Sequence, residues 1–347
     1  ASEMEKKMKS YHQKFVSDHP YESSPMAEIA GFPVRPGIYD LNGATPLQNG
    51  VNFTIHTCGG TSCELLLFHR AQEEPFAVLP FPEAYKIGDV YSMIVYGLNI
   101  DEFEYAYRVD GPYCPEKGLL FDKNKILLDP YAKAVAGQRT WGIRWDHTYH
   151  ARVVKDRFDW GDMPQSKKEL CDLIIYELHV RDFTHHPSSG VQHRGTFSGL
   201  MEKIPYLKEL GINAVELMPV YEFTELEAVK PLRQNAYPAK DQEGNPVEET
   251  PPRINYWGFK KGYYFAPKAS YSVKDPVLEF KEMVRAFHAE GMEVILQFYF
   301  PKEINREMIL EVIRYWVCEY HIDGVHLMGE QIPVGILAAD PMLTDTK

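Results

Sequence analysis

The spacing of apolar residues in the first 150 positions is that of short β-strands. In FEYAYRVDGPY (103–113) the alternate residues Phe103, Tyr105, Tyr107 and Val109 are large and apolar, the period of a strand with one buried face. Similar apolar runs at 50–57, 63–69 and 90–98 are separated by Gly, Pro and Asn. This pattern predicts an antiparallel, immunoglobulin-like β-sandwich.

Beyond residue 170 the pattern changes to apolar strands that alternate with helices. Strands are expected at 173–180, 214–219, 292–300 and in DGVHLMG (323–329), and helices at 200–210, 275–290 and 305–320. Asp275 and Pro276 are suited to begin the second of these helices, and Gly291 to end it. Such strand–helix repetition predicts parallel βα units of the α/β class, the first half of a TIM-type (β/α)8 barrel.

These patterns divide the chain into four parts. We expect a helical or extended segment at 1–30, the β-sandwich at 31–150, a polar linker at 151–172 and the partial barrel at 173–347. A half-barrel would leave strand edges and an apolar face open. The sequence therefore predicts that further residues after Lys347, or a second copy of the chain, cover them.

Composition narrows the range of partners. The 347 residues carry a formal net charge of −12, which disfavours binding to nucleic acid and to anionic membranes. The five cysteines have no metal-ligand or redox spacing, the N-terminal stretch lacks an apolar signal segment, and no apolar run reaches membrane-spanning length. A reducing, cytoplasmic setting is expected.

Several long stretches of the sequence resemble a known family. GIYDLNGATPLQNGVNFTIHT (37–57) and NKILLDPYAKAV (124–135) are similar to carbohydrate-binding module family 48, the N-terminal sandwich of isoamylases and glycogen debranching enzymes. IIYELHVRDFT (174–184), the stretches 195–223 and 255–272, and FKEMVRAFHAEGMEVIL (280–296) resemble the first half of the catalytic barrel of glycoside hydrolase family 13, of the isoamylase and pullulanase type. The likeness begins near residue 32 and runs to the end of the chain.

The resemblance implies retaining chemistry at α-glucosidic bonds, with two carboxylates about 5 Å apart. The family's third strand continues into Asp-x-x-x-Asn-His, where this chain has Gln297, Pro301 and Lys302. On the fourth strand, His326 and Met328 stand in place of an Arg and the Asp nucleophile. A thioether is a poor substitute for a carboxylate in this reaction, and the strand that carries the family's acid/base Glu is not in this sequence.

A neighbouring acid is a weak replacement. Glu330 has the strand parity of Met328 but lies roughly 6.6 Å further along, beyond the tolerance of a carboxylate pair. We therefore expect no catalytic residue in this chain and interpret Gln297, Lys302, His326 and Met328 as degenerate catalytic positions.

Aromatic residues are the better candidates for sugar contact. Substrate binding is expected at Tyr256, Trp257, Phe259 and His326, with core packing as the alternative for the first two. Trp141, Trp145 and Trp160 could stack on glucose but are expected to pack the sandwich against the barrel. Three histidines follow the first barrel strand (His185, His186, His193), and we interpret their segment as a solvated loop rather than a transition-metal site. No metal or cofactor is expected.

The sequence thus predicts an inactive relative of α-glucan debranching enzymes that binds or organises an α-glucan such as glycogen or starch. Two alternatives remain open. The first is an active hydrolase or transferase that uses residues beyond Lys347 or unusual acids. The second is a regulatory partner of an active relative, without affinity for sugar.

Overall fold

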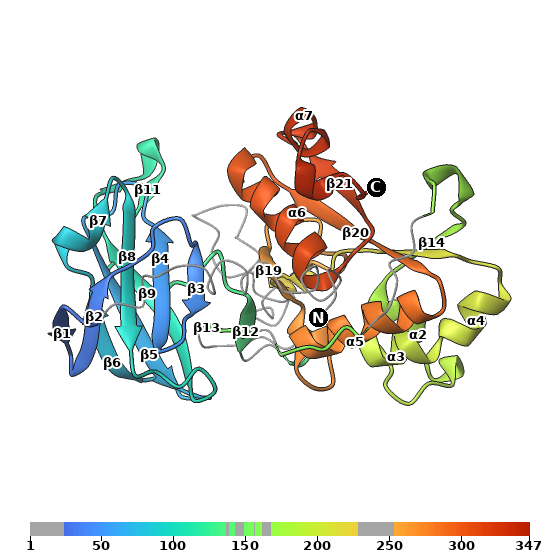
Figure 1. Ribbon diagram of the computed structural model, residues 1–347, viewed down its shortest axis with the longest axis horizontal. Helices are drawn as coiled ribbons and strands as arrows, with labels where there is room; N and C mark the ends of the chain where they lie inside the picture. Colours follow the sequence, from blue (N-terminus) through green and yellow to red (C-terminus); the bar gives the residue numbers. More distant parts are fainter. Residues whose placement is uncertain (1–23, 137–138, 143–148, 156, 162–167, 228–252) are drawn as a thin grey trace, which may run out of the picture.

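The computed structural model describes residues 24–136, 139–142, 149–155, 157–161, 168–227 and 253–347. Within these residues the chain forms a sandwich, at the left of Figure 1, and an α/β unit at the right. Trp145 lies outside the described residues.

The sandwich consists of two antiparallel sheets, which confirms the predicted architecture. One sheet has the order β1-β2-β8-β4-β3, with β7 against β8, and the other has the order β12-β13-β9-β5-β6. A short ribbon of β10 and β11 lies beside them. The strands are β1 (Ala27–Ile29), β2 (Phe32–Pro36), β3 (Gly43–Pro46), β4 (Gly50–His56), β5 (Ser62–His69), β6 (Pro75–Pro80), β7 (Lys86–Ile87), β8 (Val90–Tyr96), β9 (Phe103–Asp110), β10 (Tyr113–Cys114), β11 (Leu119–Leu120), β12 (Ala134–Ala136) and β13 (His150–Arg152).

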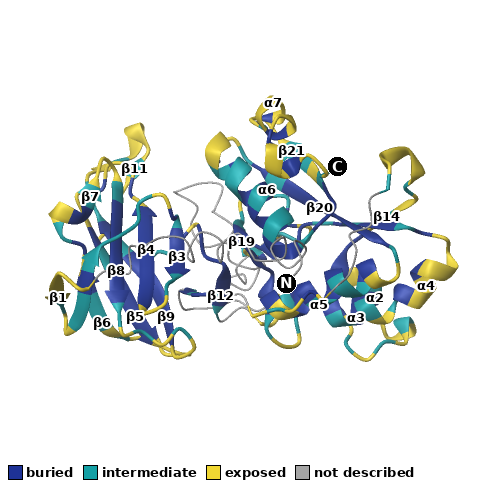
Figure 2. Ribbon diagram, in the orientation of Figure 1, coloured by how far each residue is buried: buried dark blue, intermediate teal, exposed yellow. Residues whose placement is uncertain are grey.

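The alternation of side chains along β9 explains how this strand is packed in the sandwich. Phe103, Tyr105, Tyr107 and Val109 are buried in the main core between the sheets, as their period of two predicts. Ala106, on the other face of β9, packs in a small satellite cluster with Leu66 and Phe68. Both faces of the central strand are therefore covered, and Figure 2 shows the middle strands in the dark blue of buried residues.

Four parallel strands form the sheet of the α/β unit. Their order follows the chain: β14 (Ile175–Leu178), β15 (Ala214–Leu217), β20 (Glu293–Phe300) and β21 (Gly324–Gly329). Sequential parallel strands need crossover connections, and helices supply part of them. That this sheet is the first half of a closed barrel stays a prediction.

Helices α5 (Pro276–Ala289) and α6 (Arg306–Tyr320) cover one face of this sheet. The cap expected at Asp275 is present, since its Oδ1 accepts the N–H groups of Val277 and Leu278 at 3.0 and 3.2 Å. Phe280 and Trp316 are fully buried and lie edge to face at 5.2 Å between the two helices. The apolar stripe of each helix thus forms the core of the unit.

The helix expected at 200–210 is divided in two. Helix α3 (Phe197–Glu202) ends at Lys203, and α4 (Ile204–Glu209) begins directly after it. Pro205 lacks an N–H and its ring clashes with the preceding turn, so the helix cannot run through it. A second difference is α2 (Val180–His185), a short helix in a stretch where the sequence predicts the end of a strand and a loop.

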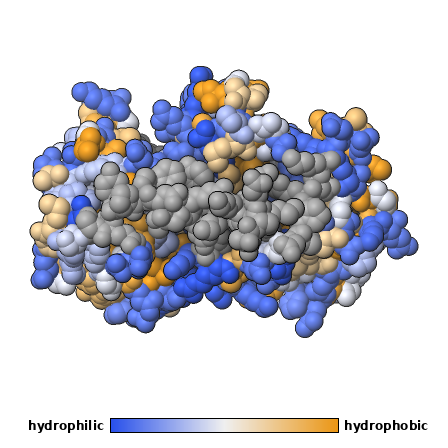
Figure 3. Space-filling view, viewed as in Figure 1, coloured by the Kyte–Doolittle hydropathy of each residue, from blue (hydrophilic) through white to orange (hydrophobic). Residues whose placement is uncertain are grey.

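The remaining strands and the last α-helix are short. They comprise β16 (Tyr221–Glu222) paired with β19 (Tyr263–Pro267), β17 (Leu226–Glu227) paired with β18 (Arg253–Ile254), and helix α7 (Val334–Ala338). Hydrophobic residues are visible around α7 in Figure 3, where Val334 and Ile336 are exposed. No helix among the described residues is both long and apolar enough to cross a membrane.

Two hydrogen-bonded contacts bear on how the parts fit together. The Asn42 amide of the sandwich donates to both carboxylate oxygens of Glu311 on α6, at 3.1 and 3.0 Å. At the other end of the unit, Lys347 N–H donates to Asp323 O at 3.0 Å and Val325 N–H donates to Lys347 O at 2.9 Å. This is the pattern of a parallel strand pair, with Lys347 opposite Gly324 on the outer edge of β21.

Candidate functional site

A row of polar side chains, one from each strand, crosses the face of the parallel sheet that points away from α5 and α6. Glu177 on β14 lies opposite Glu216 on β15, and Gln297 on β20 lies opposite His326 on β21. Gln297 Nε2 donates to Glu177 Oε1 and to Glu216 Oε1, both at 2.7 Å, and His326 Nδ1 lies 2.6 Å from Glu216 Oε1. The four strands are therefore connected by one polar network.

The amide of Gln297 holds this network together. Its nitrogen lies between two carboxylates, which are consequently no farther apart than twice 2.7 Å. A carboxylate at position 297 would add a third negative charge, whereas the amide is neutral and donates two hydrogen bonds. Gln297 is only 2% exposed, and its Oε1 has no partner among the described residues.

The C-terminal ends of β20 and β21 carry no acid. Met328 lies opposite Tyr299 in the register of β20 and β21, two residues beyond His326. Phe259 lies near the Tyr299 ring, with ring centroids 6.4 Å apart. Glu330 lies past the end of β21 and is exposed, while Lys302 is exposed in the turn between β20 and α6. The structure thus places Gln297 and His326 together and keeps Lys302 apart from them.

The predicted sugar-binding aromatics gather beside the start of α2. The Tyr256 ring stacks on His179 at 5.2 Å, and its hydroxyl donates to Asp182. Trp257 is 55% exposed and meets Phe259 edge to face at 6.3 Å. Tyr256 is therefore held by partners, while Trp257 offers a free ring face.

Trp141 and Trp160 pack against residues of the α/β unit, and their predicted role between the sandwich and the barrel stays a prediction. Trp141 stacks on Tyr271 at 5.7 Å, and Trp160 stacks on His321 at 4.0 Å and is buried. Trp141 also meets Tyr256 edge to face at 5.6 Å, which connects it to the aromatic group above. These contacts make Trp141 part of the framework beneath the candidate site, whereas Trp160 packs at the connection between α6 and β21.

A buried lysine supports this framework and was not identified from the sequence. Lys268 is fully buried, and its Nζ lies 3.0 Å from Glu222 Oε1 and 2.9 Å from Glu225 Oε1. The ammonium also lies 4.0 Å from the centre of the Phe223 ring. Burial raises the pKa of the Glu222 carboxyl, while the charge of Lys268 opposes that rise. In the sequence, the only sign of this cluster is the pair of acids Glu222 and Glu225 in YEFTE (221–225).

His179 is the N-cap of α2 and lies in the same region. Its Nδ1 accepts the N–H of Asp182 at 3.2 Å, so the ring proton resides on Nε2, which lies 3.2 Å from Tyr256 O and 3.1 Å from the Tyr271 hydroxyl. Protonation of Nδ1 would break the cap. Burial lowers the pKa of His179 below its ordinary value, because it disfavours the charged ring.

This depressed pKa predicts a dependence of stability on pH. The unfolded chain binds the proton below about pH 6.5 while the folded chain resists it, so His179 contributes stability that is present above pH 6.5 and lost as the pH falls through the folded pKa. We expect the urea midpoint to fall between pH 7.5 and 5.5, and to fall less in His179→Gln. An equal fall in both proteins would contradict this assignment.

The three histidines of the segment after β14 bond to separate partners. His185 ends α2 and lies 3.1 Å from Arg181, His186 bonds to Ser188, and His193 Nδ1 lies 3.1 Å from Glu202. Among the described residues, no group of three or more His, Cys, Asp or Glu side chains could hold a metal ion. The segment is thus partly helical, rather than the single loop that the sequence suggests.

Comparison with known proteins identifies the family of this chain. Residues 42–132 match the family model for carbohydrate-binding module 48, the isoamylase N-terminal domain. Isoamylase SU1 of Zea mays is 31% identical over 81% of this chain and 41% of its own length. A glycogen debranching enzyme of Serratia proteamaculans is 32% identical over 77% of this chain and 40% of its own length.

Solved structures agree on the fold. A pullulanase from Paenibacillus barengoltzii, determined with maltohexaose and α-cyclodextrin, matches 84% of this chain and 49% of its own with a TM-score of 0.62 at 22% identity. The chain belongs to the isoamylase-like branch of glycoside hydrolase family 13 and carries a carbohydrate-binding module of family 48. It spans about 40% of the length of the curated relatives that it matches.

Proposed function

We propose that this chain binds α-glucan at the C-terminal end of its parallel sheet and does not cleave it. The proposal takes the four-stranded sheet as the first half of a barrel, whose ligand site lies at the C-terminal ends of the strands. The observation that carries it is Met328 at that end, opposite Tyr299, where a thioether takes the place of the family's nucleophilic carboxylate.

The acids of the polar row, Glu177 and Glu216, are set back from Met328 and already engaged by Gln297. A retaining glycosidase needs two carboxyl groups about 5 Å apart on either side of the scissile bond. Glu177 and Glu216 have such a separation, but Glu216 lies opposite Ile295, four residues before Tyr299 on β20. Their carboxylates contact Gln297 and His326, which lie two residues, about 6.6 Å along the strand, before Tyr299 and Met328. Both carboxylates also accept hydrogen bonds from Gln297.

The aromatic residues at the mouth support sugar binding. Trp257 and Phe259 present ring faces of the kind that pack against the apolar faces of glucose units, and Tyr299 extends that surface toward Met328. His326 lies one pair deeper on β21, about half exposed. Ligands of this class are also found in the Paenibacillus barengoltzii pullulanase, which was solved with maltohexaose.

The proposal also includes the cellular compartment of the protein and the strand that would cover the edge of β21. The described cysteines are all free, which suits a reducing compartment such as the cytoplasm. The parallel pairing of Lys347 with β21 supports a further strand on that edge, supplied by the same protein or by a second copy.

Retardation in a native gel that contains glycogen tests the binding half of this proposal. We expect the protein to migrate more slowly with glycogen than without it, relative to a protein standard without affinity for glucan. Unchanged mobility at high glycogen would contradict glucan binding and favour a regulatory partner without affinity for sugar.

A further inference from the structure

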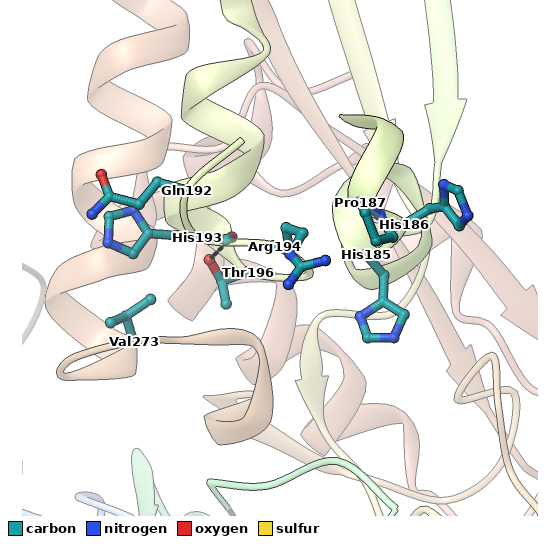
Figure 4. A pocket seen from close by; sticks show the side chains of 8 residues that line it. All are labelled: His185, His186, Pro187, Gln192, His193, Arg194, Thr196 and Val273. Atoms are coloured by element: carbon teal, nitrogen blue, oxygen red, sulfur yellow. Dashed lines mark hydrogen bonds between the residues drawn. The ribbon is translucent and has the colours of Figure 1, made fainter. Parts of the chain in front are cut away.

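A cavity open to solvent lies between the end of α2 and the start of α3. Its volume is about 650 Å³, within the range of small-molecule sites. Three imidazoles and one guanidinium line it (His185, His186, His193 and Arg194), and Pro187 and Val273 provide apolar borders. Figure 4 shows Arg194 between the two groups of histidines, with its guanidinium directed toward the turn that carries His185.

Fixed donors determine the tautomers of two of these histidines. Arg181 can only donate, so His185 Nε2, 3.1 Å away, accepts and the ring proton lies on Nδ1. The backbone N–H of Ser188 donates to His186 Nδ1 at 3.2 Å, which places that proton on Nε2. Both rings therefore keep an N–H donor for which the described residues supply no partner.

Arg194 is the strongest charge at this cavity. Its side chain is exposed, and no hydrogen bond or ion pair with another described residue engages it. A guanidinium offers several N–H donors in a planar fork and is always charged. Together with the two imidazole N–H groups it makes a set of donors suited to an anion.

The acids bordering the cavity are satisfied by the protein itself. Glu202 accepts the backbone N–H groups of Gln192 and His193 at 2.8 and 3.0 Å, and these bonds, that of Gln192 first, lower its pKa. Glu279 is buried and accepts the N–H groups of Ser198 and Val273 at 3.0 and 2.7 Å. Neither acid is among the residues that line the cavity, and Arg194 is the one permanently charged side chain in that lining.

We propose that this cavity binds the phosphate group of a small phosphorylated sugar. Arg194 and the N–H groups of His185 and His186 supply the donors, while Pro187 and Val273 border the sugar ring. The site is separate from the glucan site proposed at Trp257 and Phe259. The six-residue helix α2, about 9 Å long, lies between His179 at that site and His185 here.

Titration calorimetry at low ionic strength with glucose 6-phosphate, inorganic phosphate and glucose tests this proposal. We expect glucose 6-phosphate to bind, inorganic phosphate to bind more weakly and glucose not to bind. Arg194→Gln should weaken the binding of glucose 6-phosphate by about tenfold or more, and Arg194→Lys by less. Since Arg194 is exposed, neither change should disturb folding.

Arg306→Gln is the matched control, because it removes the same charge from an exposed position at the start of α6. It should bind glucose 6-phosphate as the unchanged protein does. Equal affinity for the two phosphates would refute the sugar contribution. No binding of either phosphate, or equal affinity in Arg194→Gln and the unchanged protein, would overturn the site. Maltohexaose affinity should be the same in Arg194→Gln, which separates this test from that of the glucan site.

Discussion

Lys268→Met is expected to lower the free energy of unfolding by about 3–5 kcal/mol, because it leaves buried carboxylates without their counter-charge. Lys268 is fully buried and is the only cation that the structure shows within ion-pair distance of Glu222 and Glu225 among the described residues. Without it the acids must either stay charged in a medium of low polarity or take up protons. Urea unfolding followed by tryptophan fluorescence measures the loss.

A second change separates this explanation from lost packing. In Lys268→Met/Glu222→Gln the carboxylate is replaced by a neutral amide, so part of the loss should be recovered. Lys302→Met is the surface control, since Lys302 is exposed, and it should change stability by less than about 0.5 kcal/mol. No recovery in the double variant would contradict the electrostatic explanation.

Trp257→Ala is expected to weaken the binding of maltohexaose by about tenfold or more, since exposed aromatic anchors carry much of the affinity of such surfaces. Its side chain is 55% exposed and contacts Phe259 rather than the core, so folding should not change. Titration calorimetry gives the affinity directly.

Trp257→Phe should retain most of the binding, because it keeps an aromatic face. Tyr206→Ala removes a comparably exposed ring from α4, away from the proposed site, and should leave the affinity unchanged. Full affinity in Trp257→Ala would contradict a glucan site at Trp257 and indicate that glucan binds elsewhere, for example on the sandwich.

The local pattern of apolar and capping residues was enough to predict most elements of the fold. Strand β9 and helices α5 and α6 lie where their periods of two and about 3.6 predict, and Asp275 caps α5 as expected. The break between α3 and α4 was missed although Pro205 signalled it, because the apolar spacing continues across the proline. Short helix α2 depends on a cap from the His179 ring, which no simple capping rule predicts.

The candidate site was predictable only as single positions. Gln297 and His326 were identified one by one, but their shared contact with Glu216 depends on the register of three strands. The partners of Lys268 are 43 and 46 residues away along the chain, so their meeting follows from the pairing of β16 with β19 and not from any local pattern. Long-range contacts of this kind are fixed by tertiary packing.

Release of reducing ends from pullulan and amylopectin is the measurement that tests the central claim most directly. Met328 stands in place of the family's Asp nucleophile and Gln297 in place of its third-strand Asp, so we expect no product above the blank even at high protein concentration, in a preparation that binds maltohexaose. Turnover that scales with protein concentration and persists in Trp257→Phe would contradict the account and show that this chain is an active glucan hydrolase.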